Sequence, residues 1–172
     1  MEQRFFFCPA CGAALGRRCL DGRERLVCND CGRIQYENPI VGVAAIVFNE
    51  EGRILMVRRS PNISYQGLWC IPCGYLEYDE DVRNGLAREI KEETGLVIKP
   101  KEVFAVYSNF HNPRQHTVGI WFLADVEGGT LEAGDDASEI GWFELEAPPP
   151  LAFPTDRLVL SDLLHKMRDN KA

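Results

Sequence analysis

The spacing of apolar residues along the chain predicts a sheet-rich domain. Long runs dominated by β-branched and aromatic residues have the composition of strands, and they occupy residues 40–48, 54–57, 117–124 and 140–145. Shorter apolar stretches of the same kind lie at residues 68–73, 96–98 and 103–107. The segments between these runs are rich in Gly, Pro, Asn and Ser, so they are predicted to be turns and loops.

Two helices interrupt this strand pattern. The first lies within residues 74–96, which open on a glycine and close on the Thr94–Gly95 pair, as expected where a loop enters and leaves a helix. The second begins near Thr155, a residue suited to the N-cap position. Its apolar face is predicted to consist of Leu158, Leu163, Leu164 and Met167. Because strands come before and after a central helix, the pattern indicates a mixed α+β fold.

Length and composition describe an ordinary globular protein. The chain has 172 residues, enough for one domain with a core and a small appendage, and 45% of them are hydrophobic. The longest apolar run, Ile40 to Phe48, is far shorter than a membrane span, and the first residues lack the apolar core of a signal peptide. We therefore expect a cytoplasmic protein without a membrane partner.

Two Cys-x-x-Cys pairs mark the beginning of the chain as a metal-binding segment. Cys8 and Cys11 form one pair, Cys28 and Cys31 form the other, and each pair is followed by a glycine that lets the backbone turn. Four sulfurs at this spacing suit tetrahedral Zn²⁺, and four thiolates leave no open coordination position, so the predicted zinc role is structural. Disulfides and a redox pair are the alternatives, and a reducing compartment and the paired motif both disfavour them.

Metal binding and charge separate two predicted domains. A zinc ribbon over residues 1–36 is too short and polar to bury a core, so zinc would supply its folding free energy, and residues 37–172 form the second domain. The net charge of −7 divides into +2 for residues 1–36 and −9 for the remainder. Because non-specific nucleic-acid binding depends on a basic surface, a nucleic-acid partner is not expected.

The helix within residues 74–96 carries an unusual density of acids. At 3.6 residues per turn, Glu89 and Glu93 lie one above the other, and Glu92 lies beside them. Like charges at this spacing destabilise an isolated helix by a few tenths of a kcal/mol per pair, so a positive group is expected among them. Carboxylate oxygens are preferred by Mg²⁺ and Mn²⁺, and Mg²⁺ commonly combines one or two carboxylates with substrate phosphates.

The same stretch resembles the signature of the Nudix hydrolases. That signature reads Gly, five residues, Glu, seven residues, then Arg-Glu-aliphatic-x-Glu-Glu-x-Gly-aliphatic. Its specified positions are filled here by Gly74, Glu80, Arg88, Glu89, Ile90, Glu92, Glu93, Gly95 and Leu96. The resemblance implies a Nudix α/β/α sandwich with a mixed sheet after the four-Cys zinc ribbon. It also implies an enzyme, a divalent-metal-dependent pyrophosphatase that splits a nucleoside diphosphate linked to X into a nucleoside monophosphate and phospho-X.

The combination with a zinc ribbon resembles a narrower group, the NADH, FAD and ADP-ribose pyrophosphatases. NADH pyrophosphatases carry Ser-Gln-Pro-Trp-Pro-Phe-Pro in a segment that contacts substrate, whereas this chain has Ser108-Asn-Phe-His-Asn-Pro113. The difference favours ADP-ribose or FAD over NADH as the nucleotide-type substrate. The resemblance also suggests that the ribbon forms a dimer or covers the substrate, and we expect a homodimer.

The resemblance assigns roles to the signature residues. Glu89 and Glu93 are implied metal ligands, Glu92 shares a metal or its water, and the backbone carbonyl of Cys73 is a further ligand. Arg88 is implied to orient the carboxylates through its forked hydrogen bonds.

Residues outside the signature complete the predicted site. The resemblance implies that an acid in the loop before the last strand binds metal or acts as base, and Asp136 fits that position best, with Glu139 as its competitor. The general base stays open among Glu89, Glu92 and this loop acid.

Five aromatic or imidazole side chains are candidates for substrate binding: Tyr36, Tyr75, Phe110, His111 and His116. Core packing is the alternative for the tyrosines, and simple loop exposure is the alternative for the histidines.

A different class of function is a nucleotide-sensing module that binds a protein or nucleic acid without strong hydrolase activity. Loss of signature acids would indicate such a module, and none of them is missing.

Overall fold

The computed structural model describes residues 3–169 and divides the chain into two compact units. The first unit ends at Asn38 and the second begins at Pro39, whereas the domain boundary expected from the sequence lies between residues 36 and 37. Each unit has its own sheet structure and is described by itself.

The first unit is a small antiparallel sheet built around sulfur atoms. Its strands are β1 (Leu15–Leu20), β2 (Arg23–Cys28) and β3 (Ile34–Gln35), in the order β1-β2-β3. The Asp21–Gly22 pair forms the two-residue turn between β1 and β2, a common hairpin sequence. The core cluster of this unit consists of Cys8, Leu15, Leu26 and Cys28, and Val27 is buried as well. So few buried side chains cannot stabilise a unit of this size alone, which agrees with a structural metal.

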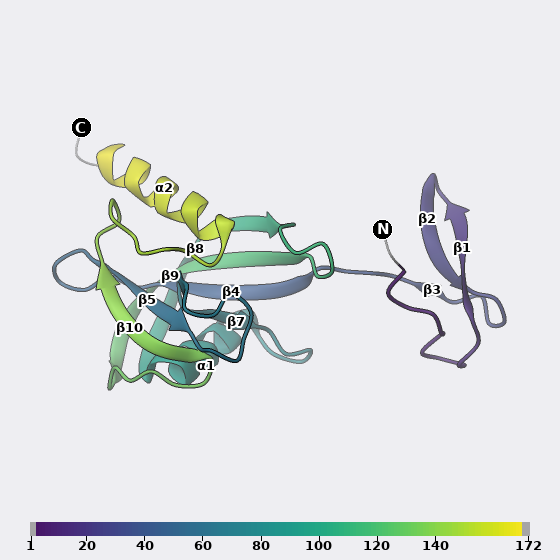
Figure 1. Cartoon of the computed structure of the whole chain (residues 1–172), viewed down its shortest axis with the longest axis horizontal. Coiled ribbons are helices and arrows are strands. Elements are labelled where there is room, and N and C mark those ends of the chain that lie inside the picture. Colours follow the sequence, from purple (N-terminus) through teal and green to yellow (C-terminus); the bar gives the residue numbers. More distant parts are fainter. Residues whose placement is uncertain (1–2, 170–172) are drawn as a thin grey trace. The chain divides into compact units, whose positions relative to one another are not determined.

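The described part of the second unit, residues 39–169, contains seven strands and two helices, and Figure 1 shows their arrangement. The elements are β4 (Ile40–Ile46), β5 (Ile54–Arg59), β6 (Trp69–Cys70), β7 (Cys73–Tyr75), α1 (Val82–Thr94), β8 (Leu96–Asn109), β9 (Thr117–Gly129), β10 (Ala137–Phe143) and α2 (Pro154–Asp169). One sheet has the order β7-β4-β9-β8 and the other β10-β5-β6. The pair β4 and β9 is parallel and the other pairs are antiparallel, so the predicted mixed sheet is confirmed.

Alternate residues of the central strands bury two different cores. In β4, Val43 and Ala45 belong to one cluster, whereas Ala44 and Ile46 belong to the other. Successive strand residues point to opposite faces, so both faces of the sheet are covered. The helices α1 and α2 provide the covers on opposite sides (Figure 1). The predicted α/β/α sandwich is therefore confirmed.

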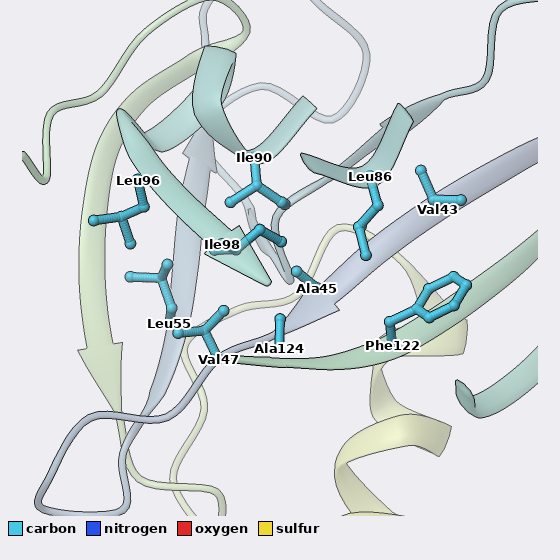
Figure 2. Close-up of a cluster of buried hydrophobic side chains, with 10 residues drawn as sticks. All are labelled: Val43, Ala45, Val47, Leu55, Leu86, Ile90, Leu96, Ile98, Phe122 and Ala124. Atoms are coloured by element: carbon cyan, nitrogen blue, oxygen red, sulfur yellow. The ribbon is translucent and has the colours of Figure 1, made fainter. Parts of the chain in front are cut away.

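The cluster beneath α1 fixes the helix that carries the acids. Figure 2 shows Leu86 and Ile90 pointing from α1 toward the strands, where they pack with residues such as Ala45 and Phe122. Both leucine and isoleucine are fully buried, whereas Arg88 and Glu92 lie on the opposite side of the helix. At its C-terminal end, α1 is capped by Gly95 in the left-handed conformation that glycine adopts most easily.

The prediction for the second helix was only partly correct. The helix begins at Pro154, so Thr155 lies inside the first turn and is not the N-cap. Leu158 and Met167 are exposed, and the buried face instead contains Thr155, Asp156, Val159, Leu160 and Leu163. Leu163 is buried and Leu164 packs against the same cluster, as predicted, but the buried polar side chain of Asp156 interrupts the apolar pattern, so apolar residues alone do not locate the whole buried face.

Asp156 makes the stability of the second unit depend on pH. Its carboxylate is 2% exposed and accepts a hydrogen bond from the Ile71 backbone N at 3.1 Å. Burial raises the pKa of Asp156 to about 7, against the opposing effects of that hydrogen bond and of the Arg59 charge. Because the pKa is raised in the folded state, protonated Asp156 contributes to the free energy of unfolding. That contribution is complete below the unfolded pKa and is lost as pH rises through about 7.

Replacing Asp156 by Asn should therefore flatten the pH dependence of unfolding. Relative to wild type, the Asp156→Asn protein should gain stability between about pH 4 and about pH 8, by at most on the order of 4 kcal/mol. Urea unfolding of the second unit at both pH values measures this gain. Asp169→Asn, at the end of α2, is the control. An equal pH dependence in wild type and Asp156→Asn would contradict the expectation.

Candidate functional site

The four predicted zinc ligands come together in the first unit. The Sγ atoms of Cys8, Cys11, Cys28 and Cys31 all lie within 4.8 Å of one another. The Sγ atoms of Cys8 and Cys31 are 3.8 Å apart and those of Cys11 and Cys28 are 3.4 Å apart, close to the edge of about 3.8 Å of a tetrahedron with Zn–S bonds of about 2.3 Å. Backbone N–H groups of Cys31 and Asp30 lower the pKa of Cys28 to about 6, which favours the thiolate that zinc binds. The donor set therefore fits structural zinc.

Arg88 organises the acids of the second unit. Its Nε and Nη2 donate to the two carboxylate oxygens of Glu80, both at 2.8 Å, in the forked geometry that guanidinium groups favour. Its Nη1 donates to Glu89 Oε1 and Glu92 Oε2, both at 2.9 Å. Its Nη2 also donates to the Tyr75 carbonyl at 3.2 Å. One side chain thus holds three glutamates and the β7 backbone.

Glu93 lies at the centre of the buried part of this cluster. Its side chain points into the domain, is 3% exposed, and accepts a hydrogen bond from the Cys73 backbone N at 2.9 Å. Burial raises the pKa of Glu93 to about 8, and the Glu89 and Asp136 charges act in the same direction. Burial also raises the pKa of Glu89, against the effect of Arg88. The buried carboxylate of Glu93 and the partly buried one of Glu89 have too little positive charge around them. Together with the exposed Glu92 and the Cys73 carbonyl, they could hold a divalent cation.

Gly74 allows Glu89 to lie directly against the β7 backbone. A Cβ atom at Gly74 would overlap the Glu89 carboxylate itself. Glycine is therefore required at this position because the Glu89 carboxylate lies against its backbone. A left-handed conformation is not the reason, since Gly74 does not have positive φ.

The Gly74→Ala variant should lose activity without losing its fold. The added methyl group must displace the Glu89 carboxylate, and a misplacement of about 1 Å at a reacting centre can cost about a hundredfold in rate. We expect a decrease of that order in kcat/KM, with a melting temperature close to wild type. Gly128→Ala is the matched control, because a Cβ there meets no atom within 4 Å. Activity of Gly74→Ala equal to that of Gly128→Ala would contradict this role.

The loop before β10 brings one of the two competing acids to the cluster. The Gly134 backbone N donates to the Glu93 carbonyl at 3.1 Å, which ties this loop to α1. The Asp136 charge acts on Glu93, and the Asp136 carbonyl accepts from the Ser60 backbone N at 2.8 Å. Glu139 instead forms an exposed ion pair with Arg58, at 3.1 Å. The geometry thus favours Asp136 over Glu139.

The predicted substrate-binding residues occupy different places. Tyr36 lies in the first unit, exposed, with the Arg25 guanidinium 5.4 Å from its ring centroid. Tyr75 is exposed on β7, directly after Gly74. The loop after β8 pairs Phe110 with His116 at a centroid distance of 4.9 Å.

His111 belongs to a second ring cluster that sequence reasoning missed. Its partners are Tyr65 and Phe153, with Arg59 beside Phe153. These residues belong to no motif and come from separate loops, so no sequence signal could have grouped them.

Comparison with known proteins covers both units. The NUDIX domain family matches residues 38–163, and the Nudix N-terminal family matches residues 7–37. The chain is 30% identical to a NUDIX hydrolase from Nitrosomonas europaea whose crystal structure superposes with a TM-score of 0.78, covering 91% of this chain and 88% of that one. None of the helices within residues 3–169 combines the length and apolar character needed to cross a membrane.

Two curated relatives carry the names of different hydrolases. The chain is 41% identical over 125 residues to an ADP-ribose pyrophosphatase of Methanocaldococcus jannaschii, covering 72% of this chain and 73% of the relative. It is 30% identical over 146 residues to a NAD-capped RNA hydrolase NudC of Stutzerimonas stutzeri, covering 84% of this chain. The chain spans 50% of the length of that second relative.

Proposed function

The chain belongs to the Nudix hydrolase family, and on that premise we propose that it hydrolyses the pyrophosphate bond of ADP-ribose or FAD, with NADH a poorer substrate. The observation that carries the proposal is the acid cluster on α1, which Arg88 holds together and which buries Glu93 against the Cys73 backbone. The name of the Methanocaldococcus relative supports ADP-ribose, and the loop Ser108–Pro113 supports a substrate other than NADH.

The acid cluster could hold a divalent cation, which uncatalysed pyrophosphate hydrolysis in water lacks. A pyrophosphate resists attack because its own negative charges repel nucleophiles, and Mg²⁺ or Mn²⁺ bound by the carboxylates would neutralise those charges and lower the pKa of a water molecule. Glu89, Glu92, Glu93 and the Cys73 carbonyl are the proposed ligands, and Asp136 extends the set. Arg88 keeps Glu89 and Glu92 in place without using a ligand oxygen of Glu93.

The reaction consumes one water molecule. Its oxygen forms a bond to one phosphorus atom, the bridging P–O bond breaks, and the products are a nucleoside monophosphate and phospho-X. One carboxylate must accept a proton from that water, and Glu89, Glu92 and Asp136 are the three candidates. Glu92 is the most solvent-accessible of the signature glutamates, with its side chain 46% exposed.

A substrate screen tests the proposal. Release of AMP is measured from ADP-ribose, FAD, NADH, NAD and diadenosine polyphosphates, with Mg²⁺ and Mn²⁺ compared. Metal-dependent turnover of ADP-ribose or FAD above the level of NADH is the expected result. No metal-dependent turnover of any of these compounds would contradict the proposal and favour a nucleotide-sensing module instead.

An RNA-linked nucleotide is a second candidate, and one feature of the first unit favours it. Arg18 and Arg25 lie directly opposite each other on β1 and β2, and Arg23 lies on the same face. Like charges in this position are destabilising, so an anion between them would stabilise the sheet. The name of the Stutzerimonas relative supports the same substrate.

Adding a NAD-capped RNA oligonucleotide to the screen tests this candidate. If RNA is recognised, Arg18→Ala with Arg25→Ala should raise KM for the capped RNA and leave KM for NAD unchanged. Arg168→Ala, on the exposed side of α2, is the control. An unchanged KM for capped RNA would exclude RNA binding by the arginine-bearing face of β1 and β2.

The remaining parts of the proposal concern organisation. We propose that the zinc ribbon occupies residues 1–36 and the catalytic domain residues 37–172, that the protein is a homodimer, and that it works in the cytoplasm. Its zinc thiolates suit a reducing compartment. Light scattering of the zinc-loaded protein measures the oligomeric state, and a monomer mass would contradict the homodimer.

A further inference from the structure

Three aromatic rings from distant parts of the chain meet in the second unit. The centroid of Tyr65 lies 5.5 Å from His111 and 5.5 Å from Phe153, with both pairs edge-to-face. The centroids of His111 and Phe153 are 5.9 Å apart, with their planes tilted by 34°. The three residues come from the loop after β5, the loop after β8 and the start of α2. We refer to Tyr65, His111 and Phe153 as the ring cluster.

The loop after β5 holds Tyr65 in an unusual backbone conformation. Tyr65 has φ of 62°, in the left-handed region that bulky residues rarely adopt and that costs about 1–3 kcal/mol. Two hydrogen bonds hold the loop in this conformation. Leu68 N donates to the Tyr65 carbonyl at 3.1 Å, and Arg59 Nε donates to the Ser64 carbonyl at 2.8 Å. Such strain at a side chain that remains 38% exposed is not explained by core packing.

Arg59 connects the ring cluster to the acid cluster. Its guanidinium carbon lies 5.2 Å from the centroid of Phe153, and its charge acts on the buried carboxylate of Glu93. Arg59 also pairs with Ala137 across β5 and β10, immediately after Asp136. The ring cluster therefore adjoins the proposed metal ligands within the same unit.

The charges around the ring cluster suit a flat, uncharged ring joined to an anion. Partial burial lowers the pKa of His111, which favours the neutral imidazole, and its Nδ1 is paired with Asn109 Oδ1. The cluster thus offers the exposed rings of Tyr65 and His111 and the partly exposed ring of Phe153, and Arg59 beside Phe153 supplies positive charge. Nucleobases stack on aromatic side chains, and the strength of stacking depends little on which base it is.

We propose that Tyr65, His111 and Phe153 form the binding site for a planar heterocyclic ring of the substrate, next to the pyrophosphate that the acid cluster receives. The inference deepens the proposed function and rests on it. The ring is either the nucleobase of the nucleoside diphosphate or a ring carried by X. Tyr65 is the key residue, because its ring contacts both other members of the cluster and its side chain remains partly exposed despite the strained backbone.

Steady-state kinetics of two tyrosine variants test the proposal. Tyr65→Leu should raise KM for ring-bearing substrates roughly tenfold while kcat changes less than about twofold, because stacking contributes to binding. Tyr65→Phe keeps the ring and should retain the wild-type KM. Tyr78→Leu is the matched control, because Tyr78 is fully exposed. Equal KM values for Tyr65→Leu and Tyr78→Leu with every substrate, or equal defects in Tyr65→Leu and Tyr65→Phe, would overturn the proposal.

The choice of substrates identifies the ring. ADP-ribose contains one planar nitrogen heterocycle, adenine, whereas FAD and NADH each carry a second one on X. An increase in KM for all three compounds assigns the cluster to adenine, and an increase confined to FAD and NADH assigns it to the ring of X. Both outcomes support the proposed site.

Equilibrium binding separates this inference from the proposed function, since it needs no turnover. Calorimetric titrations with AMP, FMN and nicotinamide mononucleotide should show weaker binding of at least one compound to Tyr65→Leu than to Tyr78→Leu. That result supports the ring site even if no substrate is hydrolysed. Equal affinities for all three compounds, together with equal KM values, would overturn it. If Tyr65→Leu lowers the melting temperature, His111→Ala replaces it, because His111 is exposed on a loop.

Discussion

Replacing Glu93 by Gln is expected to lower kcat by roughly a thousandfold, equivalent to about 4 kcal/mol of activation free energy. The amide keeps the size of the side chain and can still accept the hydrogen bond from the Cys73 backbone N, so the fold should persist. What is lost is the negative charge at the most buried position of the acid cluster. That charge is the one most dependent on a bound cation, because burial raises the pKa of Glu93 to about 8.

Single-turnover and steady-state rates of AMP release from the best substrate measure this loss. Glu102→Gln is the control, because Glu102 is exposed on β8. The melting temperature of Glu93→Gln should equal or exceed that of wild type, since removing an uncompensated buried charge relieves a desolvation cost. Turnover by Glu93→Gln within about threefold of Glu102→Gln would contradict the role of Glu93.

The second large effect concerns zinc. The Cys28→Ser variant should lose the ordered structure of the first unit while the second unit stays folded. Structural zinc contributes about 10–16 kcal/mol to the folding of small domains, and the first unit has only four buried side chains in its core, two of which are zinc cysteines. No hydrophobic core remains that could replace this contribution.

Zinc content and amide NMR spectra measure this effect together. Wild type should bind one zinc ion per chain, and Cys28→Ser should bind none and show collapsed amide dispersion for residues before Asn38. Cys19→Ser is the matched control, because Cys19 is exposed on β1 and lies outside the four-sulfur cluster. Loss of zinc from Cys28→Ser with retention of dispersed signals would show that the ribbon does not depend on this metal, and retention of full zinc content would show that Cys28 is not needed to hold it.

Local features of this molecule could be predicted from sequence because one segment determines each of them. Glu89, Glu92 and Arg88 share a helix, so their proximity follows from helical spacing alone. The two cysteine pairs carry their own spacing rule in the same way. The alternation of β4 between two cores follows from the period of a strand.

Features that depend on contacts between distant segments could not be predicted. Asp156 reads as a surface residue of an amphipathic helix, yet it is buried because Ile71 offers a backbone donor to it. Residues 96–109 form one long strand, β8, whose irregular register near Pro100 and Val103 makes it look like two segments in the sequence. The ring cluster joins three loops, and loop residues carry no periodicity that could bring Tyr65, His111 and Phe153 together.

The most direct test of the central claim is the binding of Mn²⁺ to the acid cluster, measured by electron paramagnetic resonance on zinc-loaded protein. Wild type should bind Mn²⁺ saturably, and Glu89→Gln combined with Glu93→Gln should abolish that binding while leaving the zinc content unchanged. If the double variant bound Mn²⁺ as tightly as wild type, the acid cluster of α1 would not be the metal site.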